Sequence, residues 1–220
     1  MTDSNFYGPH HRELQERFDS VGLADVLESS AARELDEGRA AFIQAASMFF
    51  LSTVDHHGRP TVSYKGGAPG FVKVVDRTTL LFPSYDGNGM YLSTGNIAAN
   101  AAVGLLFISF ERPQRLRIQG TASLSTQIED LELYPEAEMV VRVSITDAFT
   151  NCPRYVHRTS EVQISRYVPV AGVETPFAEW KRIEVLADVL RPDDAARARA
   201  LGPVDPGEWD QRVQDGHPEV

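Results

Sequence analysis

The middle of the chain is a series of short segments rich in β-branched, aromatic and aliphatic residues, each ended by a cluster of turn-forming residues. Seven segments fit this pattern: 48–54, 61–65, 71–75, 79–82, 103–110, 115–124 and 136–145. Consecutive strands joined by turns this tight pair as antiparallel neighbours, because a parallel pair needs a long crossover. One stretch interrupts the series, 90–101, where apolar residues recur at helical spacing. The sequence therefore predicts an antiparallel meander with one inserted helix.

Flanking segments complete the expected fold. Residues 11–46 carry apolar side chains mostly three or four apart, which predicts two or three amphipathic helices. Residues 177–190 also have helical character, and the tail from Asp205 is expected to be loosely held. We expect a mainly β fold with flanking helices (α+β), built as a small closed barrel. The domains would be an N-terminal helical arm (1–46), a barrel (47–190) and a C-terminal tail (191–220). A parallel nucleotide-binding sheet fits less well, since the middle section lacks regular long helices.

Composition limits the classes of partner. The chain has 31 Asp and Glu against 21 Lys and Arg, a net charge of -10, so nucleic acid and anionic membranes should be repelled. Cys152 is the only cysteine, which excludes an internal disulfide and suggests a reducing, cytoplasmic location. No stretch approaches the roughly 20 apolar residues of a membrane helix. Six scattered histidines give no reason to expect a metal site.

A glycine-rich turn leads from a strand into the inserted helix. It spans residues 83–96 and offers backbone N–H groups together with Asn88, Ser93 and Thr94, a combination suited to a phosphate. Ordinary N-capping by Asn88 explains the same residues equally well. No HExxH, Walker or GxSxG motif is present, and the catalytic residues are unknown.

Basic side chains near this turn offer charge for an anion. Lys65 ends a predicted strand beside two glycines and could contact a phosphate, although a single lysine is more often a solvated surface residue. Arg115 and Arg117 share one face of a predicted strand, where they would either bind a ligand or protect a sheet edge.

The loop at 151–158 concentrates polar and aromatic groups. Arg154 and Tyr155 are candidates for ligand contact, with an ion pair and a core position as the plain alternatives. Cys152 could be redox-active, but a lone cysteine beside a proline is more often packed and inert, which is what we expect.

Taken in order, several of these segments resemble the pyridoxamine 5'-phosphate oxidase-related flavoproteins. The resemblance rests on 48–54 with 58–60, on 64–71, and on 86–89 with 93–96, and it extends from about 41 to 158. It implies a six-stranded antiparallel split β-barrel of the FMN-binding type, forming a homodimer with FMN at each subunit interface. The cofactor contacts that it implies are Tyr64, Lys65, Gly66, Asn88, Ser93, Asn96, Arg117, Arg154 and Tyr155.

Two departures from the family pattern bear on function. Members that form pyridoxal phosphate share a Ser-Arg-Lys run after the glycine turn and an Arg-Leu-Ser-Pro-like C-terminus. This chain has Leu92-Ser93-Thr94 and ends Gly216-His217-Pro218-Glu219-Val220. We therefore expect an FMN-dependent oxidoreductase acting with a small-molecule substrate or an electron donor such as NAD(P)H, and not a pyridoxal phosphate-forming oxidase. The alternative is a non-catalytic flavin, deazaflavin or haem carrier on the same fold.

Overall fold

The computed structural model describes residues 6–112, 114–152, 156, 157, 159 and 164–215. The chain divides into two compact units, Met1–Gln163 and Ile164–Val220, which we describe separately. The expected three-part division at 46 and 190 stays a prediction.

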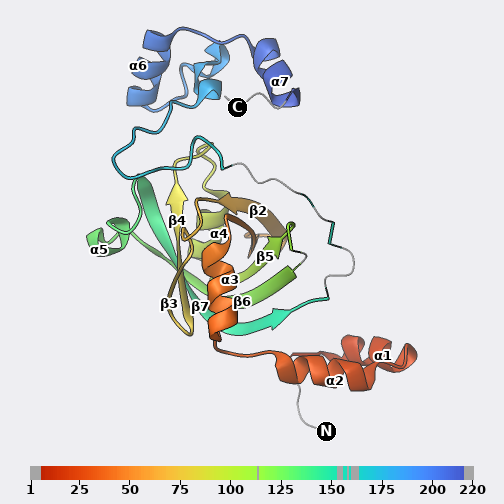
Figure 1. Cartoon of the computed structure of the whole chain (residues 1–220). Helices are drawn as coiled ribbons and strands as arrows, with labels where there is room; N and C mark the ends of the chain where they lie inside the picture. Colours follow the sequence, from red (N-terminus) through yellow and green to blue (C-terminus); the bar gives the residue numbers. More distant parts are fainter. Residues whose placement is uncertain (1–5, 113, 153–155, 158, 160–163, 216–220) are drawn as a thin grey trace. The chain divides into compact units, whose positions relative to one another are not determined.

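The first unit is built on one strongly curved antiparallel sheet (Figure 1). Its seven strands have the order β2-β1-β5-β6-β7-β4-β3. They are β1 (Met48–Val54), β2 (Pro60–Gly66), β3 (Lys73–Asp76), β4 (Thr79–Tyr85), β5 (Ala102–Ser109), β6 (Gln114–Ser125) and β7 (Ala137–Thr150). All seven predicted segments form strands, one more than the six implied by the family resemblance. The split-barrel fold class is confirmed.

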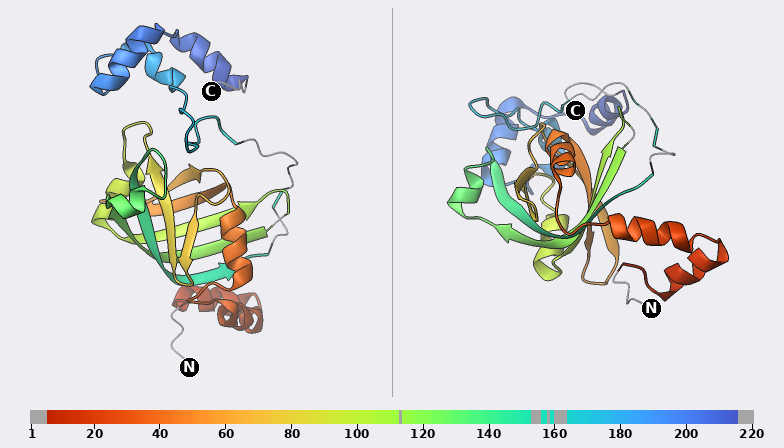
Figure 2. Two further views of the ribbon diagram at one scale, coloured as in Figure 1. Left: turned by 60° about the vertical axis from the view of Figure 1, so that its left-hand side comes forward. Right: turned by 60° about the horizontal axis from the view of Figure 1, so that its bottom comes forward.

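The expected closed barrel is wrong in one respect. Among the described residues β2 and β3 do not pair with each other, so the sheet curls without closing, as two further views show (Figure 2). Helix α3 (Glu37–Ala45) packs against β3, and α4 (Leu92–Ala99) packs against β1 and β6. Helices therefore supply part of the enclosure that strand pairing would otherwise provide.

Strict alternation in β1 places one face of this strand in the core. Phe49, Leu51 and Thr53 of β1 are buried while their neighbours are only partly so. The ring of Phe49 lies 5.0 Å from those of both Phe82 and Phe107. Burying a side chain of this size contributes roughly 1.5–3 kcal/mol. This apolar cluster therefore carries much of the stability of the unit.

A bulge between the two longest strands explains one error in the predicted boundaries. Gln119 pairs with Asp147 and Gly120 pairs with Ile145, which leaves Thr146 as an extra residue in β7. A Cβ atom on Gly120 would lie 2.3 Å from the backbone oxygen of Ser144, so glycine is required by close approach. Because the bulge breaks the period of two, the sequence pattern ends β7 at 145, whereas the strand continues to Thr150.

The N-terminal helices number three, within the expected range: α1 (Pro9–Arg17), α2 (Val21–Ser30) and α3. Asp36 caps α3 by accepting a hydrogen bond from the Arg39 backbone N–H at 2.7 Å. A short helix, α5 (Ile128–Leu131), lies between β6 and β7 and was not predicted.

The second unit is helical. It contains the 3-10 helices η1 (Glu179–Arg182) and η2 (Glu184–Leu186), then α6 (Pro192–Leu201) and α7 (Pro206–Gln214). The helix expected over 177–190 is thus two short 3-10 turns, and the region expected to be a loose tail contains α7. Pro192 and Pro206 are each the first residue of a helix, where proline costs no hydrogen bond, so these residues begin helices and do not break them.

Candidate functional site

One cavity of about 400 Å³ in the first unit gathers most of the predicted site residues. Its walls come from the end of β2, the end of β4, the glycine-rich loop and the first turn of α4. The lining residues are Ser63, Tyr64, Lys65, Ser84, Tyr85, Gly87, Asn88, Gly89, Met90, Tyr91, Leu92, Ser93 and Thr94. A cavity of this size falls within the usual range for small-molecule sites.

Lys65 supplies the positive charge of the β2 wall. Its side chain is half-buried, and this burial lowers the pKa of the ammonium because desolvation disfavours the charged form. The other two lysines have partners: Lys73 lies over the Tyr134 ring, and Lys181 pairs with Asp194 at 2.9 Å. Lys65 has no hydrogen-bond or ion-pair partner within the part of the chain that the structure describes. An anion in the cavity would supply one.

Tyr64 and Gly66 flank this lysine. Tyr64 is 62% exposed, and its ring lies against Gly66, where a Cβ atom would come within 2.7 Å of the tyrosine Cε1. Glycine therefore permits this position of the ring beside the cavity. Gly66 itself does not line the cavity.

The opposite wall is the beginning of α4. Tyr91 precedes the helix in a left-handed conformation, with φ of 47°, and no side chain caps the helix. The Tyr91 carbonyl accepts from the Gly95 N–H at 2.7 Å, whereas the N–H groups of 92–94 have no acceptor among the described residues. Free N–H groups at the positive end of a helix form a ready site for an anion.

Asn88 lies in the loop before this helix and does not cap it. Its Oδ1 accepts a hydrogen bond from the Met90 backbone N–H at 3.1 Å, which stabilises the turn. The N-capping alternative for Asn88 is therefore wrong for α4. Asn88 and Ser93 both line the cavity, and their contact with a ligand stays a prediction.

Titratable side chains in the lining are few. Burial and the nearby carboxylate of Glu136 raise the pKa of Tyr85, so its hydroxyl stays protonated. The Tyr91 hydroxyl donates to Glu138 Oε2 at 2.7 Å. As far as the described residues go, the lining contains no Asp, Glu, His or Cys side chain. Within this lining, acid–base chemistry is left to the Lys65 ammonium and the tyrosine hydroxyls, or to a bound cofactor, a substrate or water.

Asn96 and Arg117 lie apart from the lining. Asn96 is one turn further along α4 than Ser93, is 8% exposed, and binds Thr53 and Thr61. Arg117 is exposed on β6 and donates from Nε to Asn151 Oδ1 at 2.8 Å. Arg115 donates to the carbonyl oxygen of Cys152, while its own Nε is buried with no partner in the described residues.

The remaining predictions concern the loop after β7. Arg154 and Tyr155 lie outside the described residues. The Cys152 thiol is exposed, whereas we expected it to be packed. The reason is that β7 ends at Thr150, so Cys152 lies beyond the end of the strand. Among the described residues no three His, Cys, Asp or Glu side chains gather as a metal site would require. No helix among those described is long and apolar enough to cross a membrane.

Comparison with known proteins gives the family. The model of the pyridoxamine 5'-phosphate oxidase family matches residues 35–151. No curated protein matches the chain. Among solved structures, HupZ of Group A Streptococcus is 17% identical, with a TM-score of 0.45, and the match covers 57% of this chain and 99% of that one. A pyridoxamine 5'-phosphate oxidase described as putative, from Lactobacillus delbrueckii, is 22% identical over 54% of this chain and 95% of that one, with a TM-score of 0.44. An FMN-binding protein from Syntrophomonas wolfei is 11% identical over 65% and 97%, with a TM-score of 0.40.

The family match spans more than half of the 220 residues. It contains all seven strands of the sheet, α3, α4 and every residue that lines the cavity. The chain belongs to the pyridoxamine 5'-phosphate oxidase family.

Proposed function

We propose that the chain binds FMN, with the phosphate in the Lys65 cavity, and acts as an FMN-dependent oxidoreductase. The observation that carries this proposal is the half-buried Lys65 ammonium without a partner among the described residues, across a cavity from an uncapped helix N-terminus. Both walls thus present positive charge or donors to one small space. A phosphate dianion satisfies both of them.

The hydroxyl groups of the cavity fit the rest of such a ligand. Ser63, Ser84 and Ser93 line the space between the two walls and suit phosphate oxygens and a polyhydroxy chain. Met90 and Leu92 are 66% and 44% exposed at the same cavity, where they offer apolar contact to a flat ring. The residues present therefore fit FMN. When bound, FMN would supply hydride transfer, while the residues of the chain bind it, orient it and exclude water.

A pyridoxal phosphate-forming activity is not proposed. Such an enzyme must hold two phosphate groups, one on the cofactor and one on the substrate. Among the described residues Lys65 is the only cation that lines the cavity, and α4 begins with Leu92-Ser93-Thr94, which supplies no further positive charge. This set of residues has the positive charge and hydrogen-bond donors to bind one phosphate group.

The proposal includes a homodimer. Tyr64 and Val62 are exposed on β2, and the Phe50 ring on the neighbouring strand lies 6.2 Å from that of Tyr64. An apolar sheet face next to an open cavity is suited to burial by a second copy. We further propose that Arg154 and Tyr155 reach the flavin bound by the other subunit, and that NAD(P)H or a small molecule is the electron donor.

A carrier function is the second candidate, and one observation favours it. Among the described residues the lining lacks any Asp, Glu, His or Cys side chain, which leaves only Lys65 and three tyrosine hydroxyls as a possible acid or base for a catalytic step. A protein that only binds or carries a flavin, a deazaflavin or haem needs none.

The absorption spectrum of freshly purified protein tests the proposal, together with the identity of the small molecule released on denaturation. We expect a flavin spectrum, FMN as the released molecule, bleaching by NADH or NADPH under anaerobic conditions, and a dimer by sedimentation. A flavin spectrum that neither donor bleaches would favour the carrier. A haem band, or colourless protein that does not take up added FMN, would contradict the proposed cofactor.

A further inference from the structure

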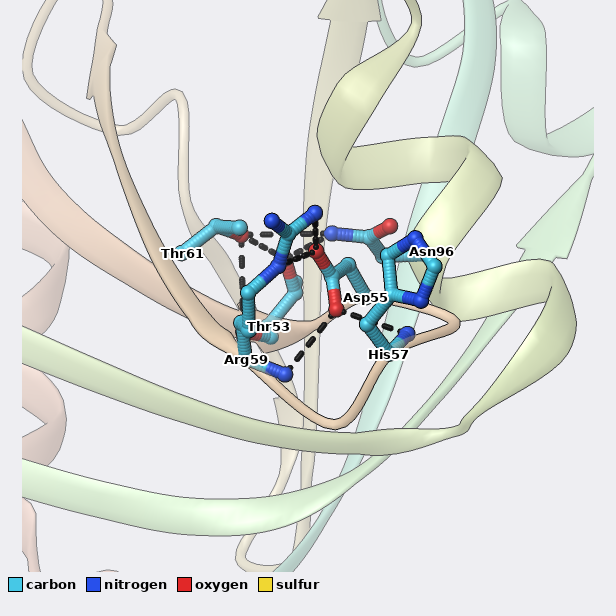
Figure 3. Close-up of polar contacts among 6 residues, drawn as sticks. All are labelled: Thr53, Asp55, His57, Arg59, Thr61 and Asn96. Carbon is cyan, nitrogen blue, oxygen red and sulfur yellow. Dashed lines mark hydrogen bonds and ion pairs between the residues drawn. The ribbon is translucent and has the colours of Figure 1, made fainter.

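Two polar links join α4 to the strands beside it. Ser93 Oγ donates to Ser63 Oγ at 2.9 Å. One helical turn later, the Asn96 amide donates to Thr53 Oγ1 at 3.0 Å and to Thr61 Oγ1 at 3.2 Å, as Figure 3 shows. The two threonine hydroxyls are themselves 2.7 Å apart. A single amide thus binds both strands of the β1–β2 hairpin.

The order of these links points to the cavity. Thr61, Ser63 and Lys65 alternate along β2 and therefore face the same side of the strand. Thr61 is hydrogen-bonded to Asn96, and Ser63 is hydrogen-bonded to Ser93, one turn nearer the beginning of α4. Successive residues of this row therefore contact successive turns of the helix. Lys65 is the next residue in the row, and the uncapped N-terminus is the next part of the helix. No side-chain hydrogen bond between described residues joins Lys65 to the beginning of α4, and the cavity lies there.

β2 depends on these links because it ends the sheet. It pairs with β1 on one side and, among the described residues, with no strand on the other. Val62 is 69% exposed, so the outer face of the strand contributes little packing. The backbone bonds to β1 do not connect β2 to α4. The side-chain links from the helix make that connection.

The link at Asn96 is built into the interior. Thr53 is 1% exposed and Asn96 8% exposed, and burial of polar groups this deep is unfavourable unless they are hydrogen-bonded. Hydrogen bonds are directional, whereas apolar contacts are not, so such a network specifies one position of the helix relative to the strands. Stability alone does not require it, because a well-packed apolar side chain could fill the same space.

We propose that Asn96 is a positioning residue for the anion cavity: by binding Thr53 and Thr61 it fixes β2 against α4, so that Lys65 and the helix N–H groups converge on one phosphate. The inference rests on the proposed function, because it takes phosphate binding as the reason why these hydrogen bonds fix the position of β2 relative to α4. Asn96 acts at a distance, because it does not line the cavity itself. Its role is to hold the site ready before the ligand arrives.

The test compares FMN with riboflavin, which has the same ring system and no phosphate. We expect Asn96→Ala to weaken FMN binding about 5- to 10-fold, as loss of a buried hydrogen-bonded link predicts. Riboflavin affinity should change less than about twofold, because the ring does not need the converging donors. Isothermal titration of the wild-type chain and each variant gives both constants.

A second pair of variants tests the same link if Asn96→Ala fails to fold. Thr61→Val removes the hydroxyl and nearly keeps the shape, whereas Thr61→Ser keeps the hydroxyl. Thr61→Val should lose the preference for FMN over riboflavin, and Thr61→Ser should retain it. Tyr134→Phe serves as the stability control, because it removes a buried hydrogen bond to the Leu81 carbonyl, 2.9 Å long, in a separate cluster. It should lower the Tm and leave the preference unchanged.

The outcomes separate the inference from the function beneath it. Wild-type protein that prefers FMN, with Asn96→Ala and Thr61→Val keeping the full preference, would overturn the positioning role and leave the FMN site intact. Wild-type protein that binds both flavins equally, or neither, would overturn the phosphate site itself, and the positioning role with it.

Discussion

The two edges of the sheet are held in different ways. β3 is packed mainly by apolar side chains: Ile43 of α3 and Val72, which precedes the strand, are 0% exposed, and Val74 packs on the same apolar cluster. β2 is held by side-chain hydrogen bonds to α4 and keeps exposed residues on its outer face. The edge that side-chain hydrogen bonds join to a helix borders the cavity, and the edge packed mainly by apolar side chains does not.

This difference separates two tasks that one sheet must perform. Apolar burial gives large stabilisation without fixing positions to fractions of an ångström. Hydrogen bonds add less net free energy each but restrict distance and angle. We infer that the β3 edge mainly stabilises the fold, whereas the β2 edge mainly positions ligand-binding groups. Substitutions at the two edges should therefore affect different measurements.

The largest expected effect is on stability, at the β3 edge. Ile43→Ala removes a side chain that is 0% exposed and leaves a cavity, so the free energy of unfolding should fall by about 2–5 kcal/mol. The FMN affinity of the folded protein should stay within about twofold. Urea unfolding and FMN titration measure the two quantities. Gln44→Ala, at an exposed position of the same helix, should change neither. A large loss of FMN affinity in folded Ile43→Ala protein would show that the two edges are not independent.

The next effect is on binding, at the β2 edge. Lys65→Ala should weaken FMN binding by roughly 1.5–3 kcal/mol, because it removes a charge-assisted contact to the phosphate. Lys73→Ala is the matched control, since it removes the same charge from β3, where the ammonium lies over the Tyr134 ring. It should leave FMN affinity nearly unchanged. Equal losses in the two variants would mean that net charge, and not a local contact, attracts the ligand.

A smaller effect with the opposite sign is expected for unliganded protein. Burial lowers the pKa of Lys65 in the folded state, so between the folded and unfolded pKa values the unfolded chain binds more protons and stability rises with pH. At neutral pH the charged, half-buried ammonium is unfavourable. Lys65→Met should therefore raise the Tm by about 2–3 °C at neutral pH, with the advantage shrinking at alkaline pH. Scanning calorimetry without flavin measures it, and a lower Tm would contradict the desolvation argument.

The fold was largely predictable because local pattern and tertiary position agree over most of the sheet. The alternation in 48–54 gives β1 its observed bounds, since one face of the strand meets the core. Where the prediction was wrong, a local rule was overridden. The bulge at Thr146 shifts the buried face of β7, and Pro206, in the region expected to be a loose tail, is the first residue of α7, a position that tolerates proline.

The candidate site was predictable only in part. The structure brings four of the predicted contacts to one cavity. They are Tyr64 and Lys65 at the end of β2, Asn88 in the glycine-rich turn and Ser93 in α4. The contacts of Asn96 could not be predicted, because Thr53 and Thr61 are 43 and 35 residues away in the sequence. The one sequence signal for these contacts was Thr53, a polar residue that follows Phe49 and Leu51 on the apolar face of β1. A polar residue at such a position indicates a partner on another element without identifying it.

The smallest expected effect compares the aspartates in the hairpin turns of the two edges. In the β1–β2 turn, Asp55 Oδ1 accepts from the backbone N–H groups of His57 and Arg59, both at 2.9 Å, and the Arg59 guanidinium pairs with Oδ2 at 2.7 Å. Asp76 accepts from the Thr78 N–H at 2.7 Å in the β3–β4 turn and has no cationic partner among the described residues. Backbone and side-chain hydrogen bonds from Arg59 lower the pKa of Asp55 to about 2, while hydrogen bonds from Thr78 lower that of Asp76.

The sign of the pH dependence follows from these shifts. A carboxylate with a lowered folded pKa stabilises the protein above its unfolded pKa, and that contribution is lost as the pH falls through the folded value. For Asp55 the window runs from the ordinary 3.8 down to about 2. Asp55→Asn should lower the Tm by about 2 °C or less at neutral pH, and its curve should meet that of the wild type near the acid end of the window, because the variant has no carboxylate to protonate. Asp76→Asn should show the same convergence at a higher pH, since its carboxylate lacks an arginine. Thermal unfolding from neutral pH to about pH 2 measures both curves. If the Tm curves of Asp55→Asn and Asp76→Asn meet the wild-type curve at the same pH, or do not meet it, Arg59 does not determine the acid dependence of stability at the β2 edge.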